Sequence, residues 1–94
     1  MKNNDFIRSF VAGALTDGDR CGNLNIRRGK FHASGEEALI LRSYYTPIAA
    51  VGAAVVWVTD ERYSVTTSRH TNATVAAAAR IGANVARSAI CPAD

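Results

Sequence analysis

The sequence predicts an α+β protein with a small antiparallel sheet of three to four strands, on which a long C-terminal helix and a shorter N-terminal helix pack. Three observations predict this class: an apolar stripe at helical spacing near the start, strand-like apolar runs in the middle, and an alanine-rich segment near the end. A chain of 94 residues is the size of one domain. We expect a single domain over residues 1–94, with the N-terminal helix and a basic loop in 1–35 and the sheet and C-terminal helix in 36–94.

The first helix is predicted to begin at Asn4 or Asp5, because either side chain can accept a hydrogen bond from the free N–H groups of a first helical turn. Turn-forming residues at Thr16–Asp19 end it. Between these limits the apolar residues share one helical face: Phe6, Ile7, Phe10, Val11, Ala14 and Leu15. Such a stripe is typical of a packing face, and a partner-binding helix is the alternative.

The densest basic patch follows a short predicted strand at Asn23–Arg27, where polar and apolar residues alternate. Ala33–Gly35 has the composition of a flexible joint. Two interpretations of the patch stay open, a solvated hairpin or loop and a loop that contacts phosphates. Its members, which surround Phe31, are Arg27, Arg28, Lys30 and His32.

Four apolar or alternating runs predict the strands of the sheet. Pro47 cannot donate to a strand ladder, so it predicts a bulge or an edge position in the second of them. The third is the most apolar and is expected to be buried. The expected strands are Glu37–Tyr45, Thr46–Val51, Ala53–Val58 and Tyr63–Thr67.

The last element is predicted as a helix from Ser68 to Ala89, stopped by Cys91 and Pro92. At helical spacing its apolar face consists of Val75, Ala78, Ile81, Gly82, Val85, Ala86 and Ala89. Opposite that face, one line of the same helix holds Arg69, Arg80 and Arg87. Arginines in this arrangement form either a solvated face or a phosphate-contacting one.

Composition gives a weak charge signal. The net charge is +3, and nine of the eleven basic residues are arginine, which favours forked contacts to phosphates and carboxylates. No apolar run reaches the roughly 20 residues of a membrane-spanning helix, and the start lacks the pattern of a signal peptide, so we expect a soluble cytoplasmic protein. Cys21 and Cys91 are expected to be two unpaired thiols, with a bridge between them as the alternative.

Residues that perform catalysis are not evident in the sequence. His70 follows several hydroxyl residues, but no acidic residue is placed to orient its imidazole, and no glycine-rich phosphate loop is present. We expect His70 to satisfy polar groups where a strand meets the last helix. The prediction is therefore a protein that is not an enzyme and that has no metal and no cofactor. Tyr44, Tyr45 and Tyr63 are the candidates for stacking on bases.

Two linked motifs, LxSYxTxIA at Leu41–Ala49 and YSxTTSxHxN at Tyr63–Asn72, resemble those of a group of short proteins of unassigned function encoded by phages and other mobile elements. The motif positions, either structural or binding, are Ser43, Tyr44, Thr46, Tyr63, Ser64, Thr66, Thr67, Ser68, His70 and Asn72. We place the structural role of the hydroxyl residues first.

The resemblance implies a non-enzymatic inhibitor in the host-cell cytoplasm that blocks a host defence complex sterically, as inhibitors of CRISPR–Cas complexes do. The alternative is a nucleic-acid-binding accessory protein of phage replication or regulation, and a self-assembling virion component is a third. The positive charge argues against mimicry of DNA. The expected partner is a protein or ribonucleoprotein, with nucleic acid possible and no membrane. The residues expected to contact it are Arg69, Arg80, Arg87, Arg27, Arg28 and Lys30.

Overall fold

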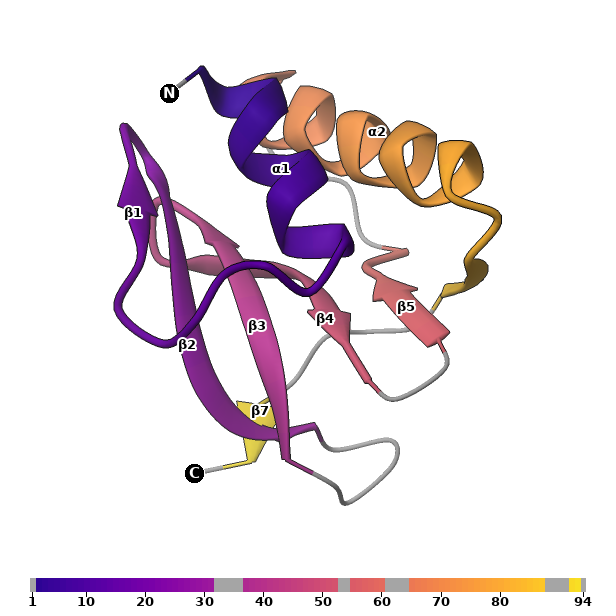
Figure 1. The fold of residues 1–94 in the computed structure, drawn as a ribbon. Coiled ribbons are helices and arrows are strands. Elements are labelled where there is room, and N and C mark those ends of the chain that lie inside the picture. The colour runs from indigo at the N-terminus through magenta and orange to yellow at the C-terminus, as the bar shows by residue number, and fades with distance from the viewer. Residues whose placement is uncertain (1, 32–36, 53–54, 61–64, 88–91, 94) are drawn as a thin grey trace.

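A computed structural model describes residues 2–31, 37–52, 55–60, 65–87 and 92–93. Two helices, α1 (Asn3–Val11) and α2 (Val65–Arg80), lie side by side on one face of a curved sheet (Figure 1). The class is α+β, as expected. The predicted three to four strands and long C-terminal helix are wrong, because the described residues contribute more strands and the second helix lies between two of them.

The sheet follows chain order along one path, β1-β2-β3-β4-β5-β6, and β7 pairs with β2 beside this path. All neighbours are antiparallel except β5 and β6, which are parallel. A parallel pair needs a crossover, and α2 provides it. The strands are β1 (Arg20–Cys21), β2 (Leu24–Phe31), β3 (Glu37–Ser43), β4 (Thr46–Val51), β5 (Val55–Val58), β6 (Asn84–Arg87) and β7 (Pro92–Ala93).

The sheet must curl to bring its last two strands into place. The five peptide links from Arg87 on β6 to Pro92 on β7 span at most about 19 Å. On a flat sheet, the five strand spacings that separate β6 from β7 would amount to about 24 Å. The curvature therefore brings the two edges of the sheet closer together than a flat arrangement would.

Helix α1 confirms the predicted packing stripe in its first part. Phe6, Ile7, Phe10 and Val11 are buried, whereas Ala14 is exposed after the end of the helix. Gly13, at φ +77°, ends α1 in the left-handed conformation that glycine adopts most easily. The predicted caps are wrong. Lys2 occupies the N-cap without a side-chain hydrogen bond, and Asn4 and Asp5 lie inside the first turn.

The basic patch lies on a strand instead of a loop. β2 runs through Arg27, Arg28 and Lys30, and pairs with β3 from Leu24 to Lys30. A polar loop supplies hydrogen-bond partners to part of the other edge of β2. The Asp19 carbonyl accepts the N–H of Ile26 at 2.9 Å, the Gly18 N–H donates to the Ile26 carbonyl at 2.9 Å, and the Asp17 carboxylate accepts the N–H of Arg28 at 3.1 Å. His32 and Ala33–Gly35 lie outside the described residues.

The β3–β4 pairing contains the irregularity that Pro47 predicts. The register shifts between Leu41, which pairs with Ala49, and Arg42, which pairs with Pro47. Ile48 is therefore left between two paired residues, and both Ile48 and Ala49 are fully buried in the core. The extra residue forms a bulge, which increases the local twist of the strand.

Helix α2 differs from the prediction at both ends. Val65 to Thr67, expected on a strand, form its first turn, while Tyr63 and Ser64 lie outside the described residues. The helix ends at Arg80 because Gly82, at φ +70°, reverses the chain. The N–H of Gly82 bonds to the Ala79 carbonyl at 3.2 Å and the N–H of Ala83 to the Ala78 carbonyl at 3.0 Å. The continuation to Ala89 is therefore wrong, and the chain turns into β6.

The buried face of α2 is largely polar. A search for apolar residues at helical spacing therefore predicted a different face. Of the predicted apolar face, Ala78 is buried, Val75 is half-buried and Ile81 is exposed. The observed face follows helical spacing with hydroxyl and imidazole side chains in its first half: Thr67, His70, Thr71, Thr74, Ala77 and Ala78.

The apolar core divides between the two faces of the sheet. The larger cluster joins both helices to the face of the sheet beneath them, through side chains such as Phe6, Leu41 and Val58. A smaller cluster on the opposite face, here called the far face, contains Ala38, Ile40, Ala50 and Trp57. Among the described residues, no helix has both the length and the apolar character needed to cross a membrane.

Candidate functional site

Strand alternation places a row of polar side chains on the far face of the sheet. Leu24 and Ile26 of β2 are buried under the helices. Asn25 and Arg27 alternate with them along the strand, so their side chains lie on the far face of the sheet. Asn25 pairs with Arg20 on β1 and with Arg42 on β3. Side chains from three neighbouring strands therefore lie side by side.

These side chains surround a concave pocket of about 410 Å³, here called the arginine pocket. The two-residue turn between β3 and β4 adds an aromatic ring to its wall. Arginines from β1, β2 and β3 contribute its charge. The lining residues are Gly18, Arg20, Asn25, Ile26, Arg27, Arg42 and Tyr45.

The turn that carries Tyr45 is held in an uncommon conformation. Tyr44 has φ +59°, a backbone angle that residues other than glycine, asparagine and aspartate rarely adopt. Two hydrogen bonds fix it, from the Tyr44 N–H to the Asn23 carbonyl at 2.6 Å and from Asn25 Nδ2 to the Tyr44 carbonyl at 2.8 Å. Backbone strain of this kind persists where surrounding contacts impose it, and it is common at binding sites.

Tyr45 stands at the edge of the pocket with its ring accessible. Its side chain is 84% exposed, and the Arg42 guanidinium carbon lies 5.5 Å from the ring centre. Arg42 Nη2 also donates to the Tyr45 carbonyl at 3.5 Å, a long hydrogen bond. Arg42 therefore links the charge of the pocket to its aromatic wall.

No carboxylate pairs with the three pocket arginines within the described part of the chain, where the ion pair found joins Asp5 to Arg8. Two acids flank Gly18 of the pocket lining, and each carboxylate accepts a backbone N–H. Asp17 accepts the N–H of Arg28, and Asp19 accepts the N–H of Thr16 at 2.8 Å. The three pocket arginines therefore have no ion-pair partner within the described residues. An anion that offers several oxygens, such as a phosphate, matches the forked donors of arginine.

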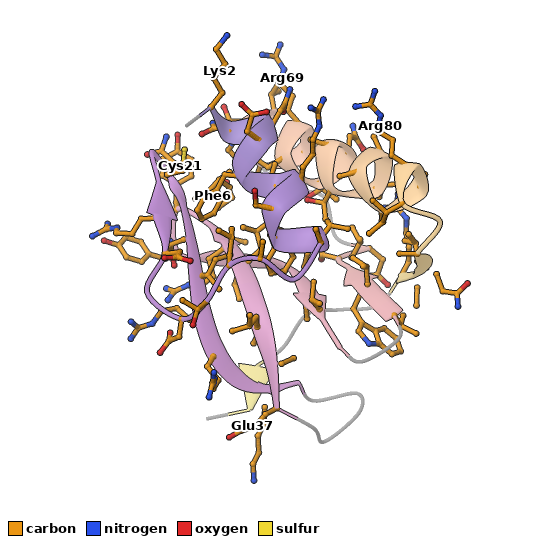
Figure 2. All side chains as sticks on the ribbon, viewed as in Figure 1. Lys2, Phe6, Cys21, Glu37, Arg69 and Arg80 are labelled. Carbon is orange, nitrogen blue, oxygen red and sulfur yellow. The ribbon has the colours of Figure 1, made fainter. Side chains whose placement is uncertain are left out.

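The structure separates the residues that were predicted to contact a partner. Arg27 lines the arginine pocket, whereas Arg28 and Lys30 are exposed elsewhere on β2. Figure 2 shows Arg69 and Arg80 on the outer side of α2, pointing away from the sheet. Arg87 lies on β6 and not on the helix, so the predicted line of three arginines does not exist.

Four pocket residues with a charged, polar or aromatic side chain were not predicted as site residues: Arg20, Asn25, Arg42 and Tyr45. Tyr45 was named only among the stacking candidates. The proximity of Arg20, Asn25 and Arg42 depends on the β1–β2 and β2–β3 registers, which pair residues 5 and 17 positions apart. The alternation around Asn25 and Arg27 is visible in the sequence, but the strand that lies beside them is not. The Gly22-Asn23 pair is a local hairpin signal that could have placed Arg20 opposite Asn25, whereas no local signal identifies Arg42 as its other neighbour.

Three residues of the motif pair, Ser43, Thr67 and His70, form a buried polar network. Ser43 Oγ lies 2.8 Å from His70 Nδ1 and 3.4 Å from Thr67 Oγ1. On the other side of the imidazole, Asn3 Nδ2 lies 3.4 Å from Nε2, and Cys21 Sγ donates to Asn3 Oδ1 at 3.6 Å. The network therefore connects α1, β1, β3 and α2.

One set of proton positions satisfies the network with a neutral imidazole. Asn3 donates to Nε2, Nδ1–H donates to Ser43, and Ser43 donates to Thr67. Burial lowers the pKa of His70 below its usual value of about 6.5, in keeping with this neutral form. Ser43 is fully buried, so no substrate reaches its hydroxyl, and the network holds the elements together.

Tyr63 and Ser64 lie outside the described residues, and the other described motif residues make no side-chain hydrogen bond with this network. Tyr44, Thr66 and Asn72 are exposed, and Thr46 and Ser68 are half-buried. The buried hydroxyl role therefore applies to Ser43 and Thr67 within the motif. Cys91 lies outside the described residues, so its pairing with Cys21 is not tested.

Fold and site together define a small α+β protein with a basic surface pocket. Residues 6–87 match the model of a family described as "Family of unknown function (DUF8033)", and the chain belongs to this family. No curated protein and no solved structure matches the chain. The family description carries no activity, so function has to be argued from the pocket.

Proposed function

We propose that this is a non-enzymatic nucleic-acid-binding protein that contacts the sugar–phosphate backbone through Arg20, Arg27 and Arg42. The observation that carries the proposal is the convergence of these three arginines, from three strands, on one concave pocket, with no carboxylate partner among the described residues. Unpaired arginines in one place repel one another, so their arrangement is best explained by an anionic ligand.

The shape of the pocket supports a phosphate-bearing ligand over a protein carboxylate. Three guanidinium groups offer forked donors from different directions, and consecutive phosphates along a strand supply oxygens at several points. Arg42 and Tyr45 add an aromatic surface at the rim, which bases can use and carboxylates cannot.

Binding to labelled oligonucleotides at several salt concentrations tests the proposal. Three phosphate contacts predict a log–log salt slope of about −2 for a single strand. The Arg20→Ala/Arg27→Ala/Arg42→Ala variant should lose most of this slope and about tenfold or more in affinity. The matched control, Arg69→Ala/Arg80→Ala/Arg87→Ala, removes the same charge from exposed positions outside the pocket. Equal losses in both variants would show non-specific attraction and would overturn the pocket assignment.

A second candidate is the inhibitor of a host defence complex, acting in the host cytoplasm, that the motif resemblance implies. The arginine pocket favours the version in which the partner is a ribonucleoprotein, because the same three arginines would then contact its RNA. Capture of a purified CRISPR–Cas complex assembled with and without guide RNA tests this version. RNA-dependent capture that is lost in the pocket variant supports it, and capture that is independent of RNA and of the pocket contradicts it.

A further inference from the structure

We infer that the ligand of the arginine pocket is single-stranded, and that one unpaired base stacks on the ring of Tyr45 while its flanking phosphates contact the arginines. This inference depends on the proposed nucleic-acid function and adds the class of nucleic acid to it. A duplex keeps its bases stacked and paired, so its base faces are closed to a side chain. An exposed aromatic ring in the site therefore favours a single strand over a duplex.

The exposure of Tyr45 is the first support. A tyrosine that served packing would bury its ring, but this one is 84% exposed. Its one aromatic-ring contact is with Arg42, at 5.5 Å from the ring centre. A base that stacks on the accessible part of the ring would extend this Tyr–Arg pair, a combination that single-strand binders use for bases of any sequence.

The rigidity of the turn is the second support. Tyr44 adopts φ +59°, and its two backbone groups are held by Asn23 and Asn25. Asn25 itself lines the pocket. The direction in which the turn presents Tyr45 is thus set before a ligand arrives, so less conformational entropy is lost on binding. A strained turn that only connected two strands would more readily contain glycine or asparagine.

The size of the pocket is the third support. A volume of about 410 Å³ is near the lower end of the range for pockets that hold small molecules, which is about 300 to 1,000 Å³. This is room for a nucleotide-sized group and not for a duplex. Asn25 and the three arginines give the lining polar and charged groups for a phosphate and its sugar, and Tyr45 gives it a ring for the base.

Competition between single-stranded and duplex oligonucleotides of the same sequence, followed by fluorescence anisotropy, tests the inference. We expect the single strand to bind more tightly at every salt concentration. Tyr45→Leu, which keeps an apolar side chain but removes the ring, should weaken single-strand binding about 5- to 150-fold. Tyr45→Phe keeps the ring and should stay within about twofold of the wild type. Ile81→Ala, which removes an exposed apolar side chain outside the pocket, is the control and should bind as the wild type does.

The outcomes separate this inference from the proposed function. Duplex binding as tight as single-strand binding, or Tyr45→Leu binding equal to that of the wild type, would overturn the single-strand inference. If the triple arginine variant still loses binding in that case, the proposed function stands without it. If the wild type binds no oligonucleotide, both fall. Inorganic polyphosphate, which has no bases, serves as a further probe, and Tyr45→Leu should bind it as the wild type does.

Discussion

The hydroxyl of Ser43 on β3 lies 2.8 Å from Nδ1 of His70 on α2, 27 positions later in the chain. Ser43 is the last residue of β3, and the strained Tyr44 follows it directly. The hydrogen bond that attaches α2 to the sheet is therefore adjacent to the turn that presents Tyr45 to the arginine pocket. The β3–β4 hairpin thus belongs both to the folding core and to the candidate site.

Replacement of Ser43 by alanine is expected to destabilise the protein by about 1–3 kcal/mol, because the variant leaves His70 Nδ1 buried without its partner. Urea unfolding measures the change in the free energy of unfolding. Thr66→Ala on the exposed side of α2 is the control and should stay within about 0.5 kcal/mol of the wild type. A Ser43→Ala variant as stable as Thr66→Ala would mean that the network contributes nothing to stability.

Stability should fall as the pH drops below about 6.5, the usual pKa of histidine. Burial lowers the pKa of His70 in the folded protein, so below this pH the unfolded chain binds more protons than the folded one. The free energy of unfolding then decreases by at most about 1.4 kcal/mol per pH unit until the folded pKa is reached. The measurement is urea unfolding of the wild type and of His70→Asn across this range. Parallel pH profiles of the two proteins would assign the effect to other groups.

Gly82→Ala should destabilise the protein by about 1–2 kcal/mol, because alanine is strained at φ +70°. A Cβ there meets nothing within 4 Å, so no steric clash contributes. If α2 continued to Ala89, the same change would instead stabilise the helix by about 1 kcal/mol. Thermal unfolding therefore decides between the two helix ends by the sign of the shift. Gly52→Ala, where φ is not positive and the nearest atom lies at 3.7 Å, should be nearly neutral.

Removal of pocket arginines should leave stability unchanged or slightly higher. Arg20 and Arg27 form no ion pair within the described residues, and each lies close to other positive charges. The Arg20→Ala/Arg27→Ala variant should be within about 0.5 kcal/mol of the wild type at high salt and more stable at low salt, where repulsion is screened less. Urea unfolding at two salt concentrations gives both values. A large loss of stability would mean that these arginines support the fold and are not reserved for a ligand.

Several features of the fold were predictable because they depend on short-range patterns. The stripe Phe6 to Val11 identifies α1, and the apolar runs identify β3, β4 and β5. Pro47 predicts the β4 bulge because proline has no backbone N–H to donate, and this property depends on that residue alone. Each of these signals acts within a few positions of the chain, so no tertiary information is required.

The nature of residues 65–87 was decided by tertiary structure. Val65 to Thr67 have strand propensity, but burial of Thr67, His70, Thr71 and Thr74 makes them part of a helix. A polar helical face is stable in the core because its groups find partners such as Ser43, and those partners are distant in the sequence. The helical spacing of the neighbouring apolar residues allowed Gly82 to lie inside a helix. Its positive φ arises because the chain turns there to enter β6, which pairs with β5.

By itself, the sequence determined the periodic elements and the excess of arginine, since both can be counted along the chain. The tertiary structure alone decided where that charge gathers. Arg20, Arg27 and Arg42 become neighbours only through strand register, because a shift of one residue would turn each side chain to the other face of the sheet. The arginine pocket is thus a property of how the strands pair, and its β2–β3 half depends on contacts between residues such as Asn25 and Arg42, 17 positions apart.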